Sequence, residues 1–467
     1  MPGTFFGIEI GRTGLAAAQV GQDVTGNNIA NAGTDGYSVQ SVDQVATDMI
    51  ASDDHSAVPV GEALGTGVAV SRIQRARDQF LDTQVREATG SKNYQSTLQG
   101  ALNQVDDAFG EPSDTGLNSA LSAFFNGFQD LANNPGDLGI RATTIQKGDA
   151  LAQVFQGVQQ RLTSLSSTLT QHVATDVQRL NDYGTQIAGL NVTIRQESAA
   201  GHPVNGLLDQ RDLLLDKISG LANISTVSNS DGTVNVSVGN QALVVGTDAY
   251  AVTQGSLTAH GNLTQGELAG LVEGQSEVAG YQGKLDTLAA SLASQVNAVH
   301  SSGAGLDGTT GLNFFTVTAG KEASTIAVNP VLEAHPEQLA AAALPAPPAS
   351  PIPPQGDAAN ASLLAGLGTK TDTSPADALY NTTLQGFYPQ TVSDAGGRAA
   401  SAKSASDSAG ATLTQLTQQR ESVTGVSTDS EMVNMLKYQR AYQASARVVQ
   451  TMDDMVGTLI NNLFSTN

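Results

Sequence analysis

Apolar residues recur every third and fourth position along the last part of the chain, from Glu431 to Leu463. This spacing is the a/d seam of a long amphipathic helix that packs against another helix. The residues Thr428 to Glu431 form a capping-box pattern, which predicts the start of the helix. An ordinary core helix in a globular domain would show the same period. The seam consists of Met435, Tyr438, Tyr442, Ser445, Val449, Met452, Val456, Leu459 and Leu463.

The first 30 residues carry a weaker seam with the same spacing, which predicts a second terminal helix. Its positions are Phe6, Ile10, Thr13, Ala17, Val20, Val24 and Asn27. Asn31, Gly33, Asp35 and Gly36 follow as strong turn formers that end the helix. Because these two helices lie at opposite ends of the chain and both need a partner, we predict that they pair with each other.

The segments between the two ends alternate between helical and strand patterns. Helical periods predict helices over 76–109, 117–131, 141–197, 206–221 and 266–300, and again from about Ala399. A short β excursion is predicted at 60–72. In 222–260 the period changes to two, with a hairpin turn at Asp231-Gly232. The proline-rich stretch 344–356 predicts an extended surface loop.

These patterns predict a mainly α fold with inserted β elements, in discontinuous nested domains. Residues 1–40 and 428–467 are predicted to form a terminal α-helical coiled coil. Residues 41–221, 261–315 and 400–427 are predicted to form a long-helix bundle core domain with short β elements. We expect a small β-hairpin insert at 222–260 and an outer insert at 316–399.

The composition excludes several classes of function. The formal net charge is −22, which argues against binding to nucleic acid or to anionic lipid. The chain has no cysteine, so disulfides, zinc–thiolate sites and thiol catalysis are excluded. The N-terminus has neither a basic region nor a continuous apolar run, so no cleaved signal peptide is expected. No segment approaches the roughly 20 apolar residues of a membrane span.

No pattern of catalytic or metal-binding residues stands out. The histidines do not form metal-spaced pairs, and no nucleotide-binding loop or nucleophile elbow is present. Asp231-Gly232 and Asp307-Gly308 are followed by no EF-hand loop, so we expect turns there. The sequence therefore predicts no enzyme, no cofactor and no metal. The histidines are His55, His172, His202, His260, His300 and His335.

Both ends of the chain resemble the axial proteins of the bacterial flagellum, a superfamily of rod, hook and junction proteins. The stretch NNIANAGTDGYS (27–38) is similar to its N-terminal signature, and MVNMLKYQRAYQASARVVQTMDDMVGTLIN (432–461) is similar to its C-terminal signature. Within the chain, the D-Q-R-D helix and hairpin of 207–244 resemble the hook-associated protein 1 family of hook–filament junction proteins. The stretch QVNAVHSSGAGLDGTTGLNFF (295–315) resembles the same family.

The resemblance implies a structural adaptor at the hook–filament junction, on which filament assembly proceeds. It implies a ring of copies of the chain, with the hook protein and the second junction protein (hook-associated protein 3) as partners. A flagellar export chaperone and the type III export apparatus are also implied, with no cleaved signal peptide and an extracellular location on the flagellum. Two alternatives remain: a hook or rod protein, and an adhesin-like module carried on the flagellum by the acidic insert.

The resemblance also implies which residues pack in the inner tube of the assembly. Both ends bury little apolar area alone, so we hypothesise that they fold when neighbouring copies supply the missing faces. The candidate polymerisation residues are Ile10, Ala17, Val24, Asn27, Asn28, Asn31, Gly36, Tyr37, Met435, Tyr438, Tyr442, Val449, Met452, Val456, Leu459 and Leu463.

Overall fold

A computed structural model describes residues 6–47, 49–50, 64–258, 263–344, 353–372, 379 and 381–464. Long helices dominate the chain, and the sheets are small. The predicted class, mainly α with inserted β elements, is therefore confirmed. Most of the predicted proline-rich loop lies outside the described residues, as do positions 60–63 of the predicted β excursion.

The chain divides into two compact units, each built from separate stretches of sequence. The first, called here the terminal unit, comprises Met1–Gly90, Arg179–Thr264 and Gly410–Asn467. The second, called the bundle unit, comprises Ser91–Gln178 and Gln265–Ala409. The residue boundaries given above for the four nested domains stay a prediction.

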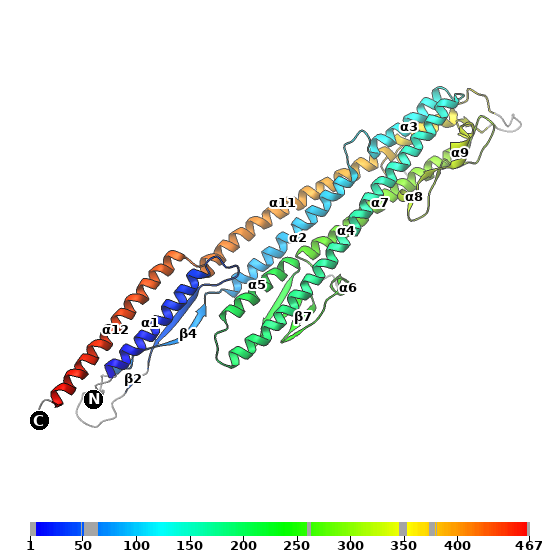
Figure 1. Ribbon diagram of the computed structural model, residues 1–467. Helices are drawn as coiled ribbons and strands as arrows, with labels where there is room; N and C mark the ends of the chain where they lie inside the picture. Colours follow the sequence, from blue (N-terminus) through cyan, green and yellow to red (C-terminus); the bar gives the residue numbers. More distant parts are fainter. Residues whose placement is uncertain are drawn as a thin grey trace. The chain divides into compact units, whose positions relative to one another are not determined.

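The terminal unit contains both ends of the chain. Helix α1 (Phe6–Ala30) packs along helix α12 (Thr428–Phe464), and the two lie side by side in Figure 1. An antiparallel ladder of β1 (Gln40–Ala46) and β4 (Val68–Arg75) covers another side of α1, with a bulge between Asp43 and Gln44. Two short strands, β2 (Met49–Ile50) and β3 (Leu64–Gly65), pair beyond it.

A small sheet completes the terminal unit. After helix α5 (Asn205–Leu221) come four antiparallel strands in the order β5-β6-β7-β8, followed by α6 (Gln254–Thr258). The predicted period of two is confirmed, because Val234, Val236 and Val238 are all buried while their neighbours are half-buried. The predicted turn is confirmed as well, with Gly232 at φ +84°. The strands are β5 (Ile224–Ser228), β6 (Val234–Val238), β7 (Gln241–Val245) and β8 (Asp248–Ala249).

Five long helices supply the bundle unit, and three of them also contribute residues to the terminal unit. They are α2 (Gln79–Phe109), α3 (Leu117–Asn133), α4 (Leu138–Ala199), α7 (Glu267–Ser301) and α11 (Leu384–Thr424). The bundle core contains Phe124, Phe128, Phe314 and Phe315, whose rings meet at centroid distances of 4.7 to 5.7 Å. Aromatic contacts of this kind add to the stabilisation that burial provides.

Short elements connect α7 to α11 and pack into the same core. Leu332, Leu339 and Leu364 are fully buried there, and α8 and α10 contact α7. The elements are β9 (Gly303–Ala304), β10 (Phe315–Thr316), α8 (Glu322–Thr325), β11 (Ala327–Val328), α9 (Pro330–Ala334), a 3-10 turn (Pro336–Gln338), β12 (Ala342–Ala343), α10 (Ala359–Gly366) and a second 3-10 turn (Leu367–Thr369).

One predicted helix boundary is wrong. Helix α11 begins at Leu384 rather than near Ala399, and it includes Pro389. A proline and glycines normally disfavour helix, which is why the pattern predicts a later start. Packing overrides this local preference, because Leu384 and Tyr388 are almost fully buried and the Tyr388 ring lies 5.7 Å from the Phe109 ring.

Candidate functional site: the terminal helix pair and its anchor

A row of glycines on α1 forms the surface that meets α12. A Cβ atom added at Gly11 would lie 2.6 Å from Val449 Cγ2, and one at Gly7 would lie 2.7 Å from Met452 Cε. Gly14 faces Ser445 in the same way, and the ring of Tyr438 covers Gly21. Because these positions carry no side chain, the two helices approach closely, with side chains of α12 lying directly on the backbone of α1.

The α1 seam expected from the sequence lies one residue away from this glycine face. Ile10 and Thr13 lie against Gly67, at the start of β4, and the carbonyl of Ala17 accepts a hydrogen bond from Gln44 Nε2 of β1. Part of the predicted seam therefore lies beside the β1–β4 ladder. The predicted pairing of the two terminal helices is confirmed, but the closest approach to α12 is made by the neighbouring glycines. A periodicity argument favours large apolar residues, whereas this contact depends on their absence.

Most of the predicted α12 seam faces α1. Tyr438, Ser445, Val449 and Met452 all lie on glycines of α1, and the Met435 Cε atom lies 3.8 Å from the Cβ position of Gly26. Val456 is half-buried, whereas Tyr442 and Leu459 are 40% and 57% exposed. The side chain of Leu463 lies outside the described residues.

Asn28 links both helices to the start of β1. Its Oδ1 atom accepts hydrogen bonds from the Tyr37 hydroxyl at 2.8 Å and from Gln40 N at 3.0 Å. Its Nδ2 atom donates to Gln40 O and to Glu431 Oε2, both at 2.8 Å. Asn28 is completely buried, and Glu431 is almost so. Burial and the nearby carboxylates of Asp209 and Glu431 raise the pKa of Tyr37 to about 12, so its hydroxyl stays protonated as a donor.

The other residues of the N-terminal signature close the loop that follows α1. Tyr37 OH also donates to Asn27 Oδ1, Asn31 Nδ2 donates to the Asn27 carbonyl, and Thr34 Oγ1 donates to Asn31 Oδ1. Gly36 has φ +78°, and a Cβ atom there would lie 3.0 Å from Leu213 Cβ. The signature thus combines local hydrogen bonds with one backbone position that favours glycine.

The start of α12 differs from the predicted capping box. Ser427 Oγ, one residue before the helix, accepts from Ser430 N at 3.4 Å, and the Glu431 carboxylate bonds to Asn28 instead of folding back on its own helix. The predicted Thr428–Glu431 box is therefore wrong. The pattern could not show that Glu431 has a partner 403 residues away.

A cluster of arginines and aspartates lies beside this network. Ser38 Oγ donates to Asp209 Oδ1 at 2.9 Å, and Arg75 Nη1 bonds to Asp209 and Asp212 at 2.7 and 2.9 Å. In addition, Val39 N donates to the carbonyl of Thr424, near the end of α11. The loop after α1, strand β4, α5 and α11 therefore meet at this point.

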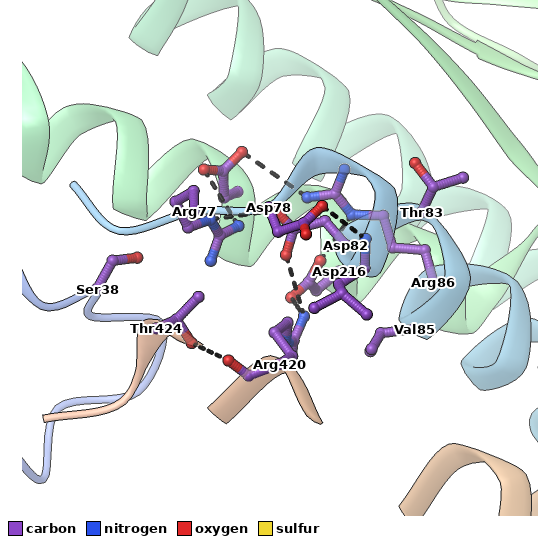
Figure 2. Close-up of polar contacts among 12 residues, drawn as sticks. Ser38, Arg77, Asp78, Asp82, Thr83, Val85, Arg86, Asp216, Arg420 and Thr424 are labelled. Atoms are coloured by element: carbon purple, nitrogen blue, oxygen red, sulfur yellow. Dashed lines mark hydrogen bonds and ion pairs between the residues drawn. The ribbon is translucent and has the colours of Figure 1, made fainter. Parts of the chain in front are cut away.

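The cluster continues through α2, as Figure 2 shows. Arg86 Nε and Arg420 Nη1 bond to opposite oxygens of Asp216 at 2.7 and 2.8 Å. Arg77 lies 3.2 Å from a carboxylate oxygen of Asp82. Burial raises the pKa of Asp82, although Arg77 and Arg86 act in the opposite direction. Asp209 and Asp212 belong to the D-Q-R-D motif found by sequence reasoning, but the four arginines were missed because they come from three separate segments.

Three family models match the chain. The flagellar hook-associated protein FlgK helical domain matches residues 102–315, the flagellar basal body rod FlgEFG protein C-terminal model matches 417–463, and the flagella basal body rod protein model matches 8–37. The flagellar hook-associated protein 1 of Bacillus subtilis (strain 168) is 30% identical, over 99% of this chain and 99% of its own length. The chain belongs to the flagellar hook-associated protein 1 family.

Other members of the hook-associated protein 1 family are more distant. The proteins of Salmonella typhimurium and Escherichia coli (strain K12) are each 25% identical, over 96% of this chain and 98% of their own length. The solved structure of the flagellar hook junction protein FlgK from Burkholderia pseudomallei shares the fold, with a TM-score of 0.61 and 19% identity. The structural match covers 73% of this chain and 100% of the Burkholderia pseudomallei chain. As a member of this family, the chain is a structural protein of the flagellar hook–filament junction.

The second family motif, 295–315, fixes the end of α7 in the bundle unit. His300 Nδ1 donates to the carbonyl of Leu312 at 2.7 Å, and His300 Nε2 accepts from Ala340 N at 3.0 Å. Asn297 exchanges two hydrogen bonds of 2.8 Å with the backbone of Phe315. Burial lowers the pKa of His300 to about 4, so the imidazole is neutral at physiological pH.

Among the described residues, no group of three or more histidine or acidic side chains is arranged so that it could hold a metal ion. Asp307-Gly308 forms the predicted turn, in which Asp307 accepts from Thr309 N and Thr309 Oγ1. Within the described part of the chain, no helix has the length and apolar character needed to span a bilayer.

Proposed function

We propose that this chain is the adaptor on which the filament is built at the hook, and that neighbouring copies complete its terminal helix pair. In this proposal residues 1–40 and 428–467 form the inner tube, and the remaining parts form shells around it. The candidate polymerisation residues divide into two sets. Those facing inward, such as Tyr438 and Val449, hold the pair together, and those facing outward meet other subunits.

The observation that supports the proposal is a set of exposed apolar side chains on α12. Met432, Leu436, Met455, Leu459 and Ile460 are between 47% and 57% exposed in the free chain. Single exposed apolar residues are common, but several on one helix, gathered near its start and near its end, mark interaction surfaces. Head-to-tail contacts between identical subunits generate rings or helical tubes, which suits a part that continues one tube into another.

Specific partners follow from the same proposal. The hook protein contacts one end of a ring of these subunits, and the second junction protein (hook-associated protein 3) contacts the other. Before assembly, a flagellar export chaperone covers the exposed apolar residues of α12, and the type III export apparatus carries the unfolded chain to an extracellular position. The chain is not an enzyme and needs no cofactor for this role.

Deletion of the gene tests the adaptor role. We expect cells that have hooks but no filaments and that release filament subunits into the medium, because filament growth would lack its base. Complementation with the wild-type gene is expected to restore filaments. Filaments of normal number and attachment in the deletion strain would reject the proposal.

Charge placed at exposed apolar positions near the two ends of α12 tests how the terminal helices assemble. The double variant Leu436→Asp, Leu459→Asp removes two exposed apolar contacts, so the subunit should fold but fail to restore filaments. The variant Gln418→Asp, which adds a charge at an exposed position of α11, is the control and should restore them. Full complementation by the double variant would show that Leu436 and Leu459 make no assembly contact.

A further inference from the structure

A cavity of about 360 Å³ lies in the terminal unit between the start of α2, helix α5 and the strands β5 and β6. Its volume falls in the range of small-molecule sites, roughly 300–1,000 Å³. Four arginines and two aspartates line it, and Thr226 and Ser228 of β5 complete the wall. The arginines are Arg75, Arg77, Arg86 and Arg211, and the aspartates are Asp82 and Asp212.

Among the residues that line the cavity, the four arginines outnumber the two aspartates. The cluster described above brings Arg75, Arg77, Arg86 and Arg420 against Asp82, Asp209, Asp212 and Asp216, which balance one another. Arg211 is the fifth arginine, and no ion pair joins it to a carboxylate of the described residues. Arg211 therefore has no carboxylate within ion-pair distance, although Asp212 attracts it from farther away.

Arg211 is held in place by neutral groups. Its Nη1 atom donates to Asn191 Oδ1 at 3.1 Å and to the Gly232 carbonyl at 2.7 Å. The residue is 9% exposed. Burial lowers its pKa, but an arginine keeps its proton in proteins, so the charge remains. A buried charge without a partner is costly, and an anion would relieve that cost.

Several N–H groups of these arginines are also without acceptors. Arg211 Nε, Arg77 Nε, Arg77 Nη2 and Arg86 Nη2 are buried and have no hydrogen-bond partner among the described atoms. The ion pairs of Arg77 and Arg86 are close enough for attraction but lack hydrogen-bond geometry. Water could accept these hydrogen bonds, but it would leave the charge of Arg211 uncompensated.

From these observations we propose that the arginine-lined cavity binds a small inorganic oxyanion, phosphate or sulfate. Planar guanidinium groups match the geometry of such oxygens and bind them by charge-assisted hydrogen bonds. The bound anion joins α2, α5 and the β5–β6 hairpin, and so stiffens the part of the terminal unit that the Ser38–Asp209 bond connects to the terminal helices.

Titration calorimetry of the full chain tests the proposal. Sodium phosphate is titrated into protein in a chloride buffer free of other oxyanions, with the ionic strength matched by sodium chloride. We expect saturable binding at one site per chain, and a thermal midpoint that rises with phosphate but not with chloride at equal ionic strength. Absence of saturable heat, or an equal effect of chloride, would overturn the proposal.

Two matched variants on β5 locate the site. Ser228→Glu places a carboxylate at an exposed position on the cavity wall, where it competes with the anion, so the affinity for phosphate should fall about tenfold or more. Ser225→Glu adds the same charge on the other face of the same strand and should leave binding unchanged. Unchanged binding in Ser228→Glu, or an equal loss in both variants, would show that phosphate does not occupy this cavity.

Arg77→Gln provides an independent variant from the arginine side. Loss of the Arg77 guanidinium removes a buried donor from the cavity. The control Arg72→Gln removes an exposed arginine from the same part of the chain; in the described residues Arg72 pairs with Asp43 at 3.2 Å. We expect weaker phosphate binding in the first and wild-type binding in the second. Equal binding in the two variants would contradict the assignment.

Discussion

The bundle unit and the terminal helix pair use helices of similar length in opposite ways. In the bundle, α3 buries Phe124 and Phe128 completely, and α7 buries Leu288, Leu292 and Val296. On α12, Glu431 is the only buried residue among those whose burial is described. The bundle therefore contains its own core, whereas α12 meets α1 only along a narrow line of contact.

The difference follows from side-chain size. Burial of apolar surface contributes roughly 25 cal/mol per Å², and ordering the backbone costs about 1–2 kcal/mol per residue. The phenylalanines of the bundle supply large areas to offset that cost. A glycine row against Tyr438 and Val449 supplies close contact but little area. A long helix in the bundle is thus supported by large buried side chains, whereas α12 has few such contacts within the subunit.

Amide hydrogen exchange on the free subunit offers the largest expected contrast. Amides of α12 should exchange with little protection, while those in the middle of α7 should exchange only on global unfolding, a difference of about 10³-fold or more. Mass spectrometry of peptic fragments measures both in one sample. Slow exchange across residues 435–463 in a monodisperse monomer would show that the pair is stable by itself.

Replacement of one aromatic residue in each region should change the free energy of unfolding much more in the bundle than in the helix pair. Phe124→Ala leaves a cavity in the bundle core and should lower the free energy of unfolding by about 3–5 kcal/mol. Tyr442→Ala removes a 40% exposed ring from α12 and should change the free energy of unfolding by less than about 0.5 kcal/mol. Urea denaturation followed by circular dichroism measures both. Equal losses would mean that the helix pair contributes to stability as the bundle does.

A pH dependence should appear in the bundle through His300. In the unfolded chain a histidine binds its proton near pH 6.5, whereas His300 in the folded chain does so near pH 4. The stability due to the neutral imidazole is therefore complete above pH 6.5 and is lost as the pH falls toward 4, a total of about 3 kcal/mol. Unfolding measured across this range should show a shallower slope for His300→Gln than for the wild type. An unchanged slope in His300→Gln would be inconsistent with a buried neutral imidazole.

The smallest effect in free energy concerns the glycine face itself. Alanine is favoured over glycine in a helix by about 1 kcal/mol, so Gly26→Ala, whose Cβ has ordinary contact distance to Met435, should be tolerated. Gly21→Ala drives a Cβ into the Tyr438 ring and should weaken pairing by about 1–3 kcal/mol. Counting filaments in complemented deletion cells compares the two variants. If both restore filaments equally, close approach of the helices is not required.

The helices and their order could be predicted from the sequence because each carries a regular apolar period. Tyr438, Val449 and Met452 were assigned correctly to the face toward α1, since large side chains define that face. The facing residues of α1 were not found, because Gly7 and Gly11 have no side chain to mark a stripe. The start of α11 was misplaced for the reverse reason, as buried Tyr388 holds a segment that local preferences disfavour.

The anchor beside the helix pair was visible only in part. The N-terminal signature and the D-Q-R-D motif drew attention to Asn28, Tyr37 and Asp209, but a sequence pattern does not give their partners. Asn28 reaches Glu431 across 403 positions, and Asp216 joins arginines that lie 334 positions apart in α2 and α11, at 86 and 420. Long-range polar contacts of this kind depend on the finished fold, so no local period indicates them.

The Asn28–Glu431 bond has a mechanical consequence. Apolar faces slide and rotate over one another with little resistance, but a buried hydrogen bond to a carboxylate is directional and short. Torque applied to either terminal helix therefore passes at this end into the β1 backbone through Gln40, rather than being lost as slippage between smooth surfaces. A directional bond of this kind keeps two thin helices in register without a large core of their own.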